Sequence, residues 1–223
     1  MADRIAPDAP VLVIGLGRFG SATAAQLVRQ GRDVLIVDDD TATVQRWADR
    51  VTHAVQADAR DIDALRQIGA ADFQVAVVGV GQSIEGSVLI TSNLVDLGIP
   101  QIWAKAISDT HGRILTRIGA TRVVYPEAEA GERTAHLVSG RMLDYIEFDD
   151  DFAIVKMHPP GPAIGRRIGD LAGAAKNGVR IAGVKSPGGA FQEAAPDTVV
   201  SAGDILIVAG TEAQLERFSS LGD

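Results

Sequence analysis

A segment near the N-terminus has the residue types and spacing to bind phosphate. An apolar run at residues 11–14 is followed by Gly15, Leu16, Gly17, Arg18, Phe19 and Gly20. Glycines let the backbone approach a phosphate, and free N–H groups at the positive end of a helix dipole then hold the anion. A tight strand-to-helix turn is the alternative. The strand-length run before the segment and the helix-length segment after it favour a dinucleotide-type loop.

Three acidic residues, Asp38, Asp39 and Asp40, follow the second apolar run, at residues 34–37. Asp38 comes 18 residues after Gly20, where a carboxylate can accept hydrogen bonds from both hydroxyls of a ribose. A carboxylate at this place also repels a 2′-phosphate, which argues against NADP. Asp38 and its neighbour Asp39 could instead cap the next helix or lie solvated in a loop, but we favour ribose binding.

Later loops carry further candidate residues. Loops after parallel strands emerge at one edge of a sheet, where ligands bind in open α/β folds. The candidates there are Asp58, Gly79, Lys105 and Glu127. Lys105 is the best placed to meet a phosphate, with a surface lysine as the alternative. Glu127 could equally be a first-turn acid favoured by the helix dipole.

Arg18 adds a cation inside the glycine segment. A guanidinium binds phosphate oxygens bidentately, so Arg18 could reach the terminal phosphate of its own ligand or of a ligand in a neighbouring subunit. A solvated loop arginine is the alternative.

The elements that must position these residues alternate along the chain. Apolar runs of strand length occur at residues 11–14, 34–37, 54–56, 75–78, 102–104 and 123–124. Segments of helical length lie between them, at 21–30, 41–50, 61–68, 83–97 and 109–118. Runs that are apolar on both faces are typical of buried parallel strands. The pattern therefore predicts an α/β fold with a Rossmann-like, doubly wound parallel sheet.

The pattern changes near residue 140. Residues 126–143 are predicted as one longer helix, after which strand candidates lie close together. We expect a domain at 1–140 and a small α+β module at 141–223. The elements expected in the module are a hairpin of 145–148 and 152–157, a helix at 168–175, strands at 180–185 and 204–209, and a helix at 212–219.

Composition excludes several classes of function. The 223 residues include 21 Lys and Arg against 29 Asp and Glu, a net charge of −8, which does not suit nucleic-acid binding. The chain has no cysteine, which excludes thiol chemistry. Its longest apolar stretches are strand-length, and residues 1–10 do not form a signal peptide, so we expect a cytoplasmic protein. The histidines are isolated and no nucleophile motif accompanies them, so we expect no enzyme.

Several strings together resemble one family. VIGLGRFG, THAVQADA, IWAKA, RIGATRVVYPE, LDYIEF and AGDILIVAG are similar to the KtrA/TrkA type of RCK proteins, which regulate potassium conductance. The resemblance covers nearly the whole chain. It implies a cytosolic ring of dimers, commonly octameric, that docks on a membrane potassium channel subunit at the inner face of the membrane and responds to ATP or ADP.

The resemblance also implies roles for individual residues. The nucleotide would lie over Gly15 to Gly20, with ribose on Asp38, adenine near Asp58 and Ala59, and phosphates near Lys105. Arg18 would contact the γ-phosphate across a dimer interface, and Glu127 would help to hold Mg²⁺ or Na⁺ with the nucleotide. Binding of cyclic di-AMP, known for the family's C-terminal lobe, is not expected, because Ala174 and Asn177 replace a basic and an aromatic residue.

Two alternatives remain at this stage. A small NAD-dependent oxidoreductase would share the glycine segment and Asp38, but it needs a proton-handling residue and a substrate domain. A sensor module that binds NAD or NADH without catalysis fits the same fingerprint.

Overall fold

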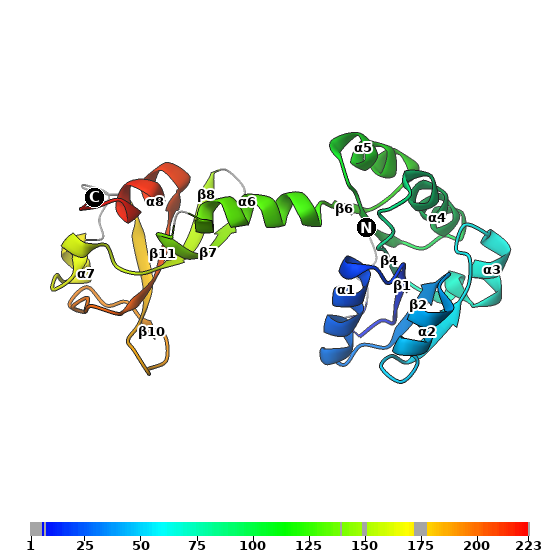
Figure 1. Ribbon diagram of the computed structural model, residues 1–223, viewed down its shortest axis with the longest axis horizontal. Coiled ribbons are helices and arrows are strands. Elements are labelled where there is room, and N and C mark those ends of the chain that lie inside the picture. The colour runs from blue at the N-terminus through cyan, green and yellow to red at the C-terminus, as the bar shows by residue number, and fades with distance from the viewer. Residues whose placement is uncertain (1–5, 7, 139, 149–150, 172–177, 223) are drawn as a thin grey trace. The chain divides into compact units, whose positions relative to one another are not determined.

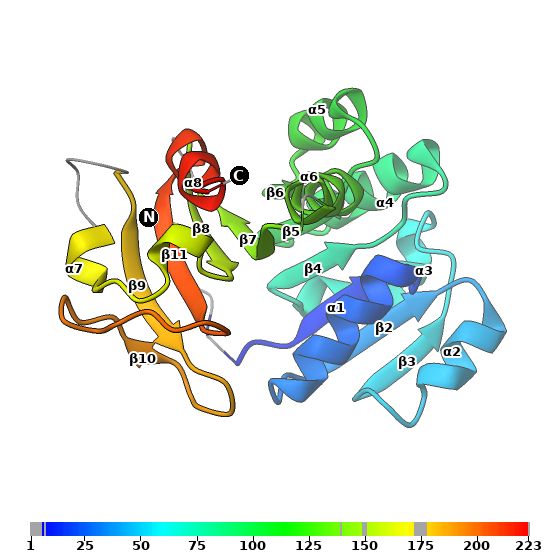
Figure 2. The same cartoon turned by 60° about the vertical axis from the view of Figure 1, so that its left-hand side comes forward.

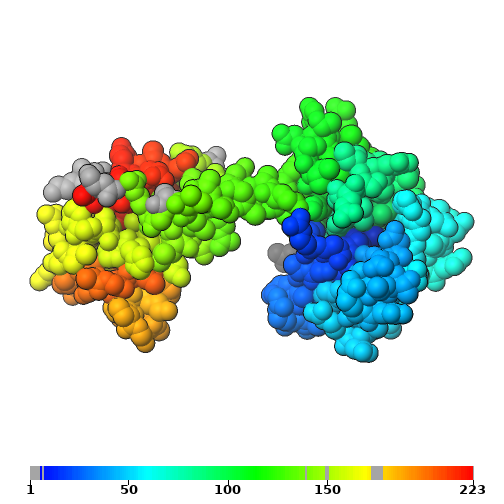
Figure 3. Space-filling view, viewed as in Figure 1, coloured from blue at the N-terminus to red at the C-terminus, as the bar shows by residue number. Residues whose placement is uncertain are grey.

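The computed structural model describes residues 6, 8–138, 140–148, 151–171 and 178–222. By its internal contacts the chain forms two compact units, Met1–Glu127 and Ala128–Asp223. In Figure 3 the first unit is coloured blue to green and the second green to red. The domain division at 140/141 counts the helix that begins at Pro126 with the first domain, and it stays a prediction.

The first unit is built on a six-stranded parallel sheet (Figure 1), as the alternating pattern predicted. The strands are β1 (Val11–Ile14), β2 (Val34–Asp38), β3 (His53–Gln56), β4 (Val75–Val78), β5 (Gln101–Lys105) and β6 (Arg122–Val124). Their order is β3-β2-β1-β4-β5-β6, so the sheet grows outward on both sides of β1. This is the doubly wound order of dinucleotide-binding folds, with its switch point between β1 and β4.

Helices cover both faces of this sheet (Figure 2). They are α1 (Arg18–Arg29), α2 (Thr41–Trp47), α3 (Ile62–Gln67), α4 (Ile84–Asp96) and α5 (Asp109–Ile118), with a short 3₁₀ turn at Ala70–Asp72. Alternate residues of β1 serve opposite faces. Leu12 packs with Leu65 of α3 and Leu94 of α4, while Val13 packs with Ala24 of α1 and Trp47 of α2. Each fully buried aliphatic side chain contributes about 1.5–3 kcal/mol, which fixes the register of the strand ends.

The second unit has an antiparallel five-stranded sheet. Its strands are β7 (Met142–Glu147), β8 (Phe152–Met157), β9 (Arg180–Lys185), β10 (Gln192–Glu193) and β11 (Ile205–Thr211), in the order β10-β9-β11-β8-β7. Beside the sheet are a 3₁₀ turn (Gly161–Ala163), α7 (Ile168–Leu171) and α8 (Glu212–Ser219). Phe218 and Leu215 of α8 are fully buried against Leu206 and Val208 of β11. The small α+β module is confirmed, although β10 was not predicted.

The long helix predicted at 126–143 is too long. Helix α6 covers Pro126–Val138, and β7 begins at Met142. Gly140 has a φ of +73°, a left-handed conformation that ends a helix at little cost. Residues 142–147 form a strand because they pair with β8, Met142 opposite Met157 and Tyr145 opposite Val155, with an irregularity between Met142 and Asp144.

Two further observations bear on the sequence predictions. Helix α7 includes the start of the helix expected at 168–175, but residues 172–177, including Ala174 and Asn177, lie outside the described residues. Over the described ranges, no helix combines the length and the apolar character that spanning a bilayer requires.

Candidate functional site

The predicted site residues come together at one edge of the parallel sheet. The glycine segment follows β1, Asp38 ends β2, Asp58 follows β3, Gly79 follows β4, Lys105 ends β5 and Glu127 follows β6. All these strands run in the same direction, so their carboxyl ends and the loops that follow them share this edge. Ligands of doubly wound sheets bind at this edge, close to the switch point.

Three glycines of the loops are required by close packing. Gly15 has a φ of +85°, and a Cβ on it would lie 2.6 Å from Cγ2 of Val80. A Cβ on Gly79 would lie 2.6 Å from the carbonyl oxygen of Gly15, and a Cβ on Gly20 would overlap that same oxygen. The loops after β1 and β4 therefore touch through backbone atoms, and larger residues at these positions would separate them.

Gly17 is different, because the protein's own packing does not require it. No atom of the described residues lies within 4 Å of a Cβ built there. Its φ of −61° and ψ of −172° form an extended conformation that any residue adopts. Gly17 is the N-cap of α1, and serine or aspartate would serve that position equally well. The missing side chain leaves the backbone at the helix N-terminus open to a ligand.

The carboxylate of Asp38 holds the glycine segment in place. Its Oδ2 accepts a hydrogen bond from Leu16 N at 2.6 Å, and its Oδ1 accepts one from Asp40 N at 3.0 Å. Asp40, rather than Asp38 or Asp39, caps helix α2, because its side chain accepts from the N–H groups of Ala42 and Thr43. The capping alternative for Asp38 is therefore wrong, and its carboxylate lies between β2 and the loop after β1.

Three predicted site residues, Leu16, Phe19 and Asp39, have side chains that lie in the core or in solvent. Leu16 is buried at 7% exposure and Phe19 packs beside it against the core under α1 and α2, so both can offer a ligand only backbone groups. Asp39 is exposed, and its carbonyl accepts a hydrogen bond from Gln56 Nε2 at 3.2 Å.

Lys105 and Glu127 form an ion pair at the β5–β6 side of the edge. Lys105 Nζ donates to Glu127 Oε1 at 2.6 Å, and the lysine side chain is only 12% exposed against 58% for the glutamate. The hydrogen bond from Lys105 is the main cause that holds the pKa of the Glu127 carboxyl below its usual range, and the positive charge of Arg18 contributes. Lys105 is therefore not a free surface lysine, and Arg18 lies close enough to act on Glu127.

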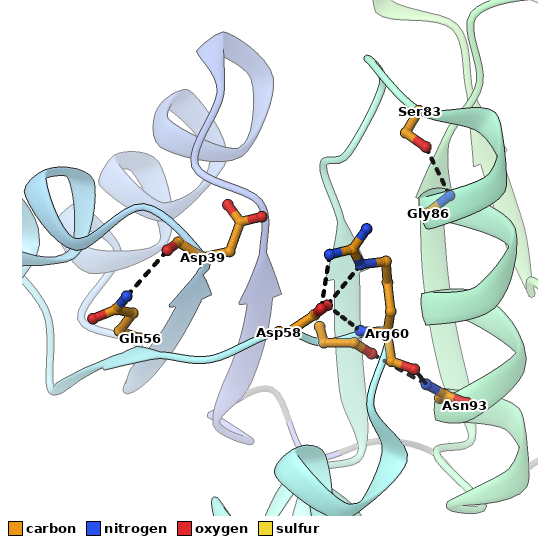
Figure 4. Close-up of polar contacts among 8 residues, drawn as sticks. Asp39, Gln56, Asp58, Arg60, Ser83, Gly86 and Asn93 are labelled. Carbon is orange, nitrogen blue, oxygen red and sulfur yellow. Dashed lines mark hydrogen bonds and ion pairs between the residues drawn. The ribbon is translucent and has the colours of Figure 1, made fainter.

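Sequence reasoning missed Arg60, which lies at the same edge (Figure 4). Its Nε donates to Asp58 Oδ1 at 2.8 Å and its Nη2 donates to Asp58 Oδ2 at 2.7 Å. These bonds are the main cause that holds the pKa of the Asp58 carboxyl below its usual range. Ala59, between them, is buried, and its carbonyl accepts from Asn93 Nδ2 at 3.2 Å. In the sequence, only the position of an arginine two residues after Asp58 could have predicted this ion pair.

His111 is the one histidine buried among the described residues. Its Nδ1 accepts a hydrogen bond from Ile107 N at 3.4 Å, while Nε2 has no partner within the described part of the chain. Burial lowers the pKa of this imidazole. In the ranges the structure covers, no group of three or more His, Asp or Glu side chains is arranged to hold a metal ion. A cation bound by Glu127 would therefore also need oxygen atoms from a bound nucleotide.

Comparison with known proteins places the chain among potassium uptake proteins. The TrkA-N domain family matches residues 11–126 and the TrkA-C domain family matches residues 152–221. The Ktr system potassium uptake protein A of Bacillus subtilis is 35% identical over 211 residues, which cover 94% of this chain and 95% of that protein. The chain belongs to the Ktr/TrkA family. The resemblance seen in the sequence strings is thereby confirmed.

Solved structures with the same fold include those of the GsuK channel and its RCK domain. The crystal structure of the GsuK RCK domain superposes with a TM-score of 0.67 at 20% identity, covering all of this chain and 49% of that one. The GsuK channel bound to NAD gives a TM-score of 0.63 at 19% identity, with 99% and 40% covered. This Ktr/TrkA-family chain thus spans about half the length of those channel chains or less, and the likeness concerns the fold.

Proposed function

We propose that the chain is a nucleotide-binding regulatory subunit of a potassium uptake system, working at the inner face of the membrane. Membership of the Ktr/TrkA family supports the transport role, since its relative in Bacillus subtilis is a potassium uptake protein over almost the same length. A membrane-embedded potassium channel or transporter subunit is the partner this role requires, and a ring of dimers, octameric by analogy, is the assembly.

Gly17 carries the nucleotide part of the proposal. It leaves backbone N–H groups open at the N-terminus of α1 although the protein's packing does not require a glycine there. A phosphate is the ligand that such a helix N-terminus favours. Asp38 ends β2 and would bind the ribose, and Lys105 ends β5 and would bind the phosphates.

The proposed ligands are ATP and ADP, and the exchange of one for the other is the regulatory signal. ATP has one more phosphate, and Arg18, exposed at the start of α1, would meet it in its own subunit or a neighbouring one. A ligand shifts a conformational equilibrium only through different affinities for the two states. We therefore assign the difference between ATP and ADP to Arg18 and Glu127, which act on each other electrostatically.

Glu127 fits a cation that travels with the nucleotide. Lys105 donates to Oε1 of Glu127. Because the glutamate side chain is exposed, its other oxygen, Oε2, can contact a ligand. Mg²⁺ is commonly held by one or two carboxylates together with phosphate oxygens and water, and Na⁺ would use the same oxygen groups. The cation would neutralise phosphate charge beside the first turn of α6.

NAD or NADH is the second candidate ligand. Asp38 and the glycine segment suit an adenosine ribose in either molecule, and the GsuK channel with the same fold has been solved with NAD. Under this alternative the chain would sense the dinucleotide and still regulate potassium transport.

Calorimetric titration of the purified chain with ATP, ADP, NAD and NADH tests the proposal. At a hundredfold excess over its Kd the native ligand should stabilise the fold by about 2.7 kcal/mol. Arg18→Ala should narrow the difference between ATP and ADP, whereas Arg29→Ala, at the other end of α1, should leave it unchanged. Deleting the gene that encodes the chain should alter potassium uptake by the cell. A chain that binds none of the four compounds would refute nucleotide regulation.

A further inference from the structure

The side chains of Asp58 and Arg60 are joined by a bidentate contact at the ligand edge. The contact is bidentate, with Nε and Nη2 of the guanidinium on the two carboxylate oxygens at 2.8 and 2.7 Å. Arg60 N adds a third bond to Oδ1 at 2.9 Å. A guanidinium fork paired in this way fixes the plane of the carboxylate as well as its charge.

The backbone under this pair is tied to helix α4. Nδ2 of Asn93 donates to the carbonyl oxygen of Arg60 at 2.9 Å and to that of Ala59 at 3.2 Å. The stem of Arg60 passes the first turn of α4, where a Cβ on Gly86 would lie 3.8 Å from Arg60 Cδ. Figure 4 shows the guanidinium between the loop of Asp39 and this turn. The pair is therefore held from two sides before any ligand arrives.

One acceptor position of the Asp58 carboxylate remains unused. An ionised carboxylate has about four lone-pair positions and no donor. Oδ1 receives two hydrogen bonds and Oδ2 receives one, all from Arg60, and no other described residue donates to them. Oδ2 can thus accept one more hydrogen bond, and it cannot donate one while Arg60 keeps the group ionised.

The pair stands next to the expected place of the ribose. In the sheet, β3 neighbours β2, and Asp38 and Gln56 are register partners at the ends of these strands. A nucleoside whose ribose meets Asp38 therefore places its base toward the segment that follows β3. A 6-amino group on this base donates hydrogen bonds, whereas a 6-oxo group only accepts them.

We infer that Arg60 is a positioning residue that makes Asp58 a reader of the purine base, accepting the 6-amino group of adenine and rejecting the 6-oxo group of hypoxanthine or guanine. The inference rests on the proposed nucleotide function and deepens it. With the base in the position of adenine, a 6-oxo group would face the carboxylate acceptor and leave both without a donor. The base would have to shift to bring its N1–H to Oδ2, which penalises a 6-oxo purine. The selection applies to the adenine of ATP, ADP or NAD alike.

A second ion pair in the same unit provides a matched control. Arg66 Nη1 lies 2.7 Å from Asp63 Oδ1, the same distance as in the Asp58–Arg60 pair, and the two arginine side chains are similarly exposed, at 57% and 53%. Both partners belong to α3, outside the loops that follow the strands. Replacing Arg66 alone changes the net charge by the same amount as replacing Arg60, without affecting Asp58.

The test compares the affinities of the chain for ATP and for inosine triphosphate, which differ at the base alone. By calorimetry the 223-residue chain should bind ATP about tenfold or more tightly than inosine triphosphate. Arg60→Gln should reduce this ratio to about threefold or less, and Arg60→Lys, which keeps the charge but not the fork, should restore part of it. Arg66→Gln should keep the full ratio. Asp58→Asn should bring the ratio near one, because a carboxamide both donates and accepts.

The possible outcomes separate this inference from the proposed function. If Arg60→Gln loses affinity for both compounds but keeps the ratio between their affinities, the inference is overturned. Arg60 would then attract nucleotides by its charge alone. If Arg60→Gln does not fold, an unchanged ratio in Arg60→Lys and Asp58→Asn overturns it. A chain that binds both compounds equally refutes base selection and leaves nucleotide binding intact. If only NAD binds, the same comparison is made with its deamino analogue, and absence of all binding refutes both.

Discussion

Lys105 Nζ and Glu127 Oε1 lie 2.6 Å apart, so one hydrogen bond joins the end of β5 to the first turn of α6. The lysine is nearly buried, with its terminal carbon and nitrogen close to Gly81, while the glutamate is largely exposed. The buried cation is therefore fixed by the fold, and the exposed carboxylate is the partner that a ligand can reach.

Replacing Lys105 with methionine should weaken nucleotide binding. The variant keeps the apolar stem but removes the cation beside the phosphates and leaves Glu127 without its partner. We expect the Kd for ATP to rise about tenfold or more, with a smaller rise for AMP, as measured by calorimetry. Lys185→Met, in β9 of the second unit, is the control and should bind as the wild type does. Equal affinities of Lys105→Met and the wild type for ATP would remove this lysine from the site.

The two glycines Gly17 and Gly20 should separate folding from binding. Gly20→Ala forces a Cβ onto the carbonyl oxygen of Gly15, and this overpacking should cost about 1–3 kcal/mol of stability. Gly17→Ala meets no described atom and should cost at most about 1 kcal/mol, through the weaker N-cap. Denaturant unfolding measures both costs. Gly17→Ala should nevertheless lose ATP affinity, because its methyl group lies where the phosphate approaches, and wild-type affinity in this variant would contradict that placement.

Asp38 should determine the preference for ribose over deoxyribose. Its carboxylate already lies beside the glycine loop, 2.6 Å from Leu16 N, and can accept hydrogen bonds from both ribose hydroxyls. The wild type should bind ATP about tenfold more tightly than 2′-deoxy-ATP, and Asp38→Asn should lose most of this preference. Asp33→Asn serves as the control, because Asp33 precedes β2 and lies at the opposite edge of the sheet. An unaltered preference in Asp38→Asn would place the sugar elsewhere.

The stability of the first unit should fall as the pH drops below the ordinary histidine range. Burial lowers the folded-state pKa of His111, so the unfolded chain binds a proton there while the folded chain does not. The free energy of unfolding should therefore be constant above about pH 6.5 and decrease below it, by up to about 1.4 kcal/mol per pH unit.

Denaturant titrations between pH 5 and 8 check this pH dependence. His111→Gln should flatten the dependence in this range even if the variant is less stable throughout, while His53→Gln, at an exposed position of β3, should not. A wild-type curve that stays level down to pH 5, or an equal slope in His111→Gln, would show that His111 is not the group responsible.

The fold of the first unit was predictable because its strands are buried on both faces. All four residues of β1 are buried, and such runs do not resemble helices of half-buried periodicity. The helix predicted at 126–143 failed because Met142 and Leu143 are apolar in either element. The strand is decided by the pairing of β7 with β8, which a local apolar pattern does not contain.

The candidate site was predictable to the extent that sheet topology orders the loops. Gly17, Asp38 and Lys105 reach one edge because parallel strands require it. Arg60 was missed because its role depends on the tether from Asn93, 33 residues away, and on its fork around Asp58. A short motif does not contain contacts of that range.

Helix α6, described throughout Pro126–Val138, has no buried residue. Its end belongs to the second unit, where Leu137 packs on the core and Arg133 pairs with Asp144, but buried side chains do not hold its first turns. Glu127 belongs to its first turn, next to the ligand edge. A phosphate or cation that binds this carboxylate would therefore act on an exposed first turn. Little of its binding energy would be needed to change the direction of the helix there.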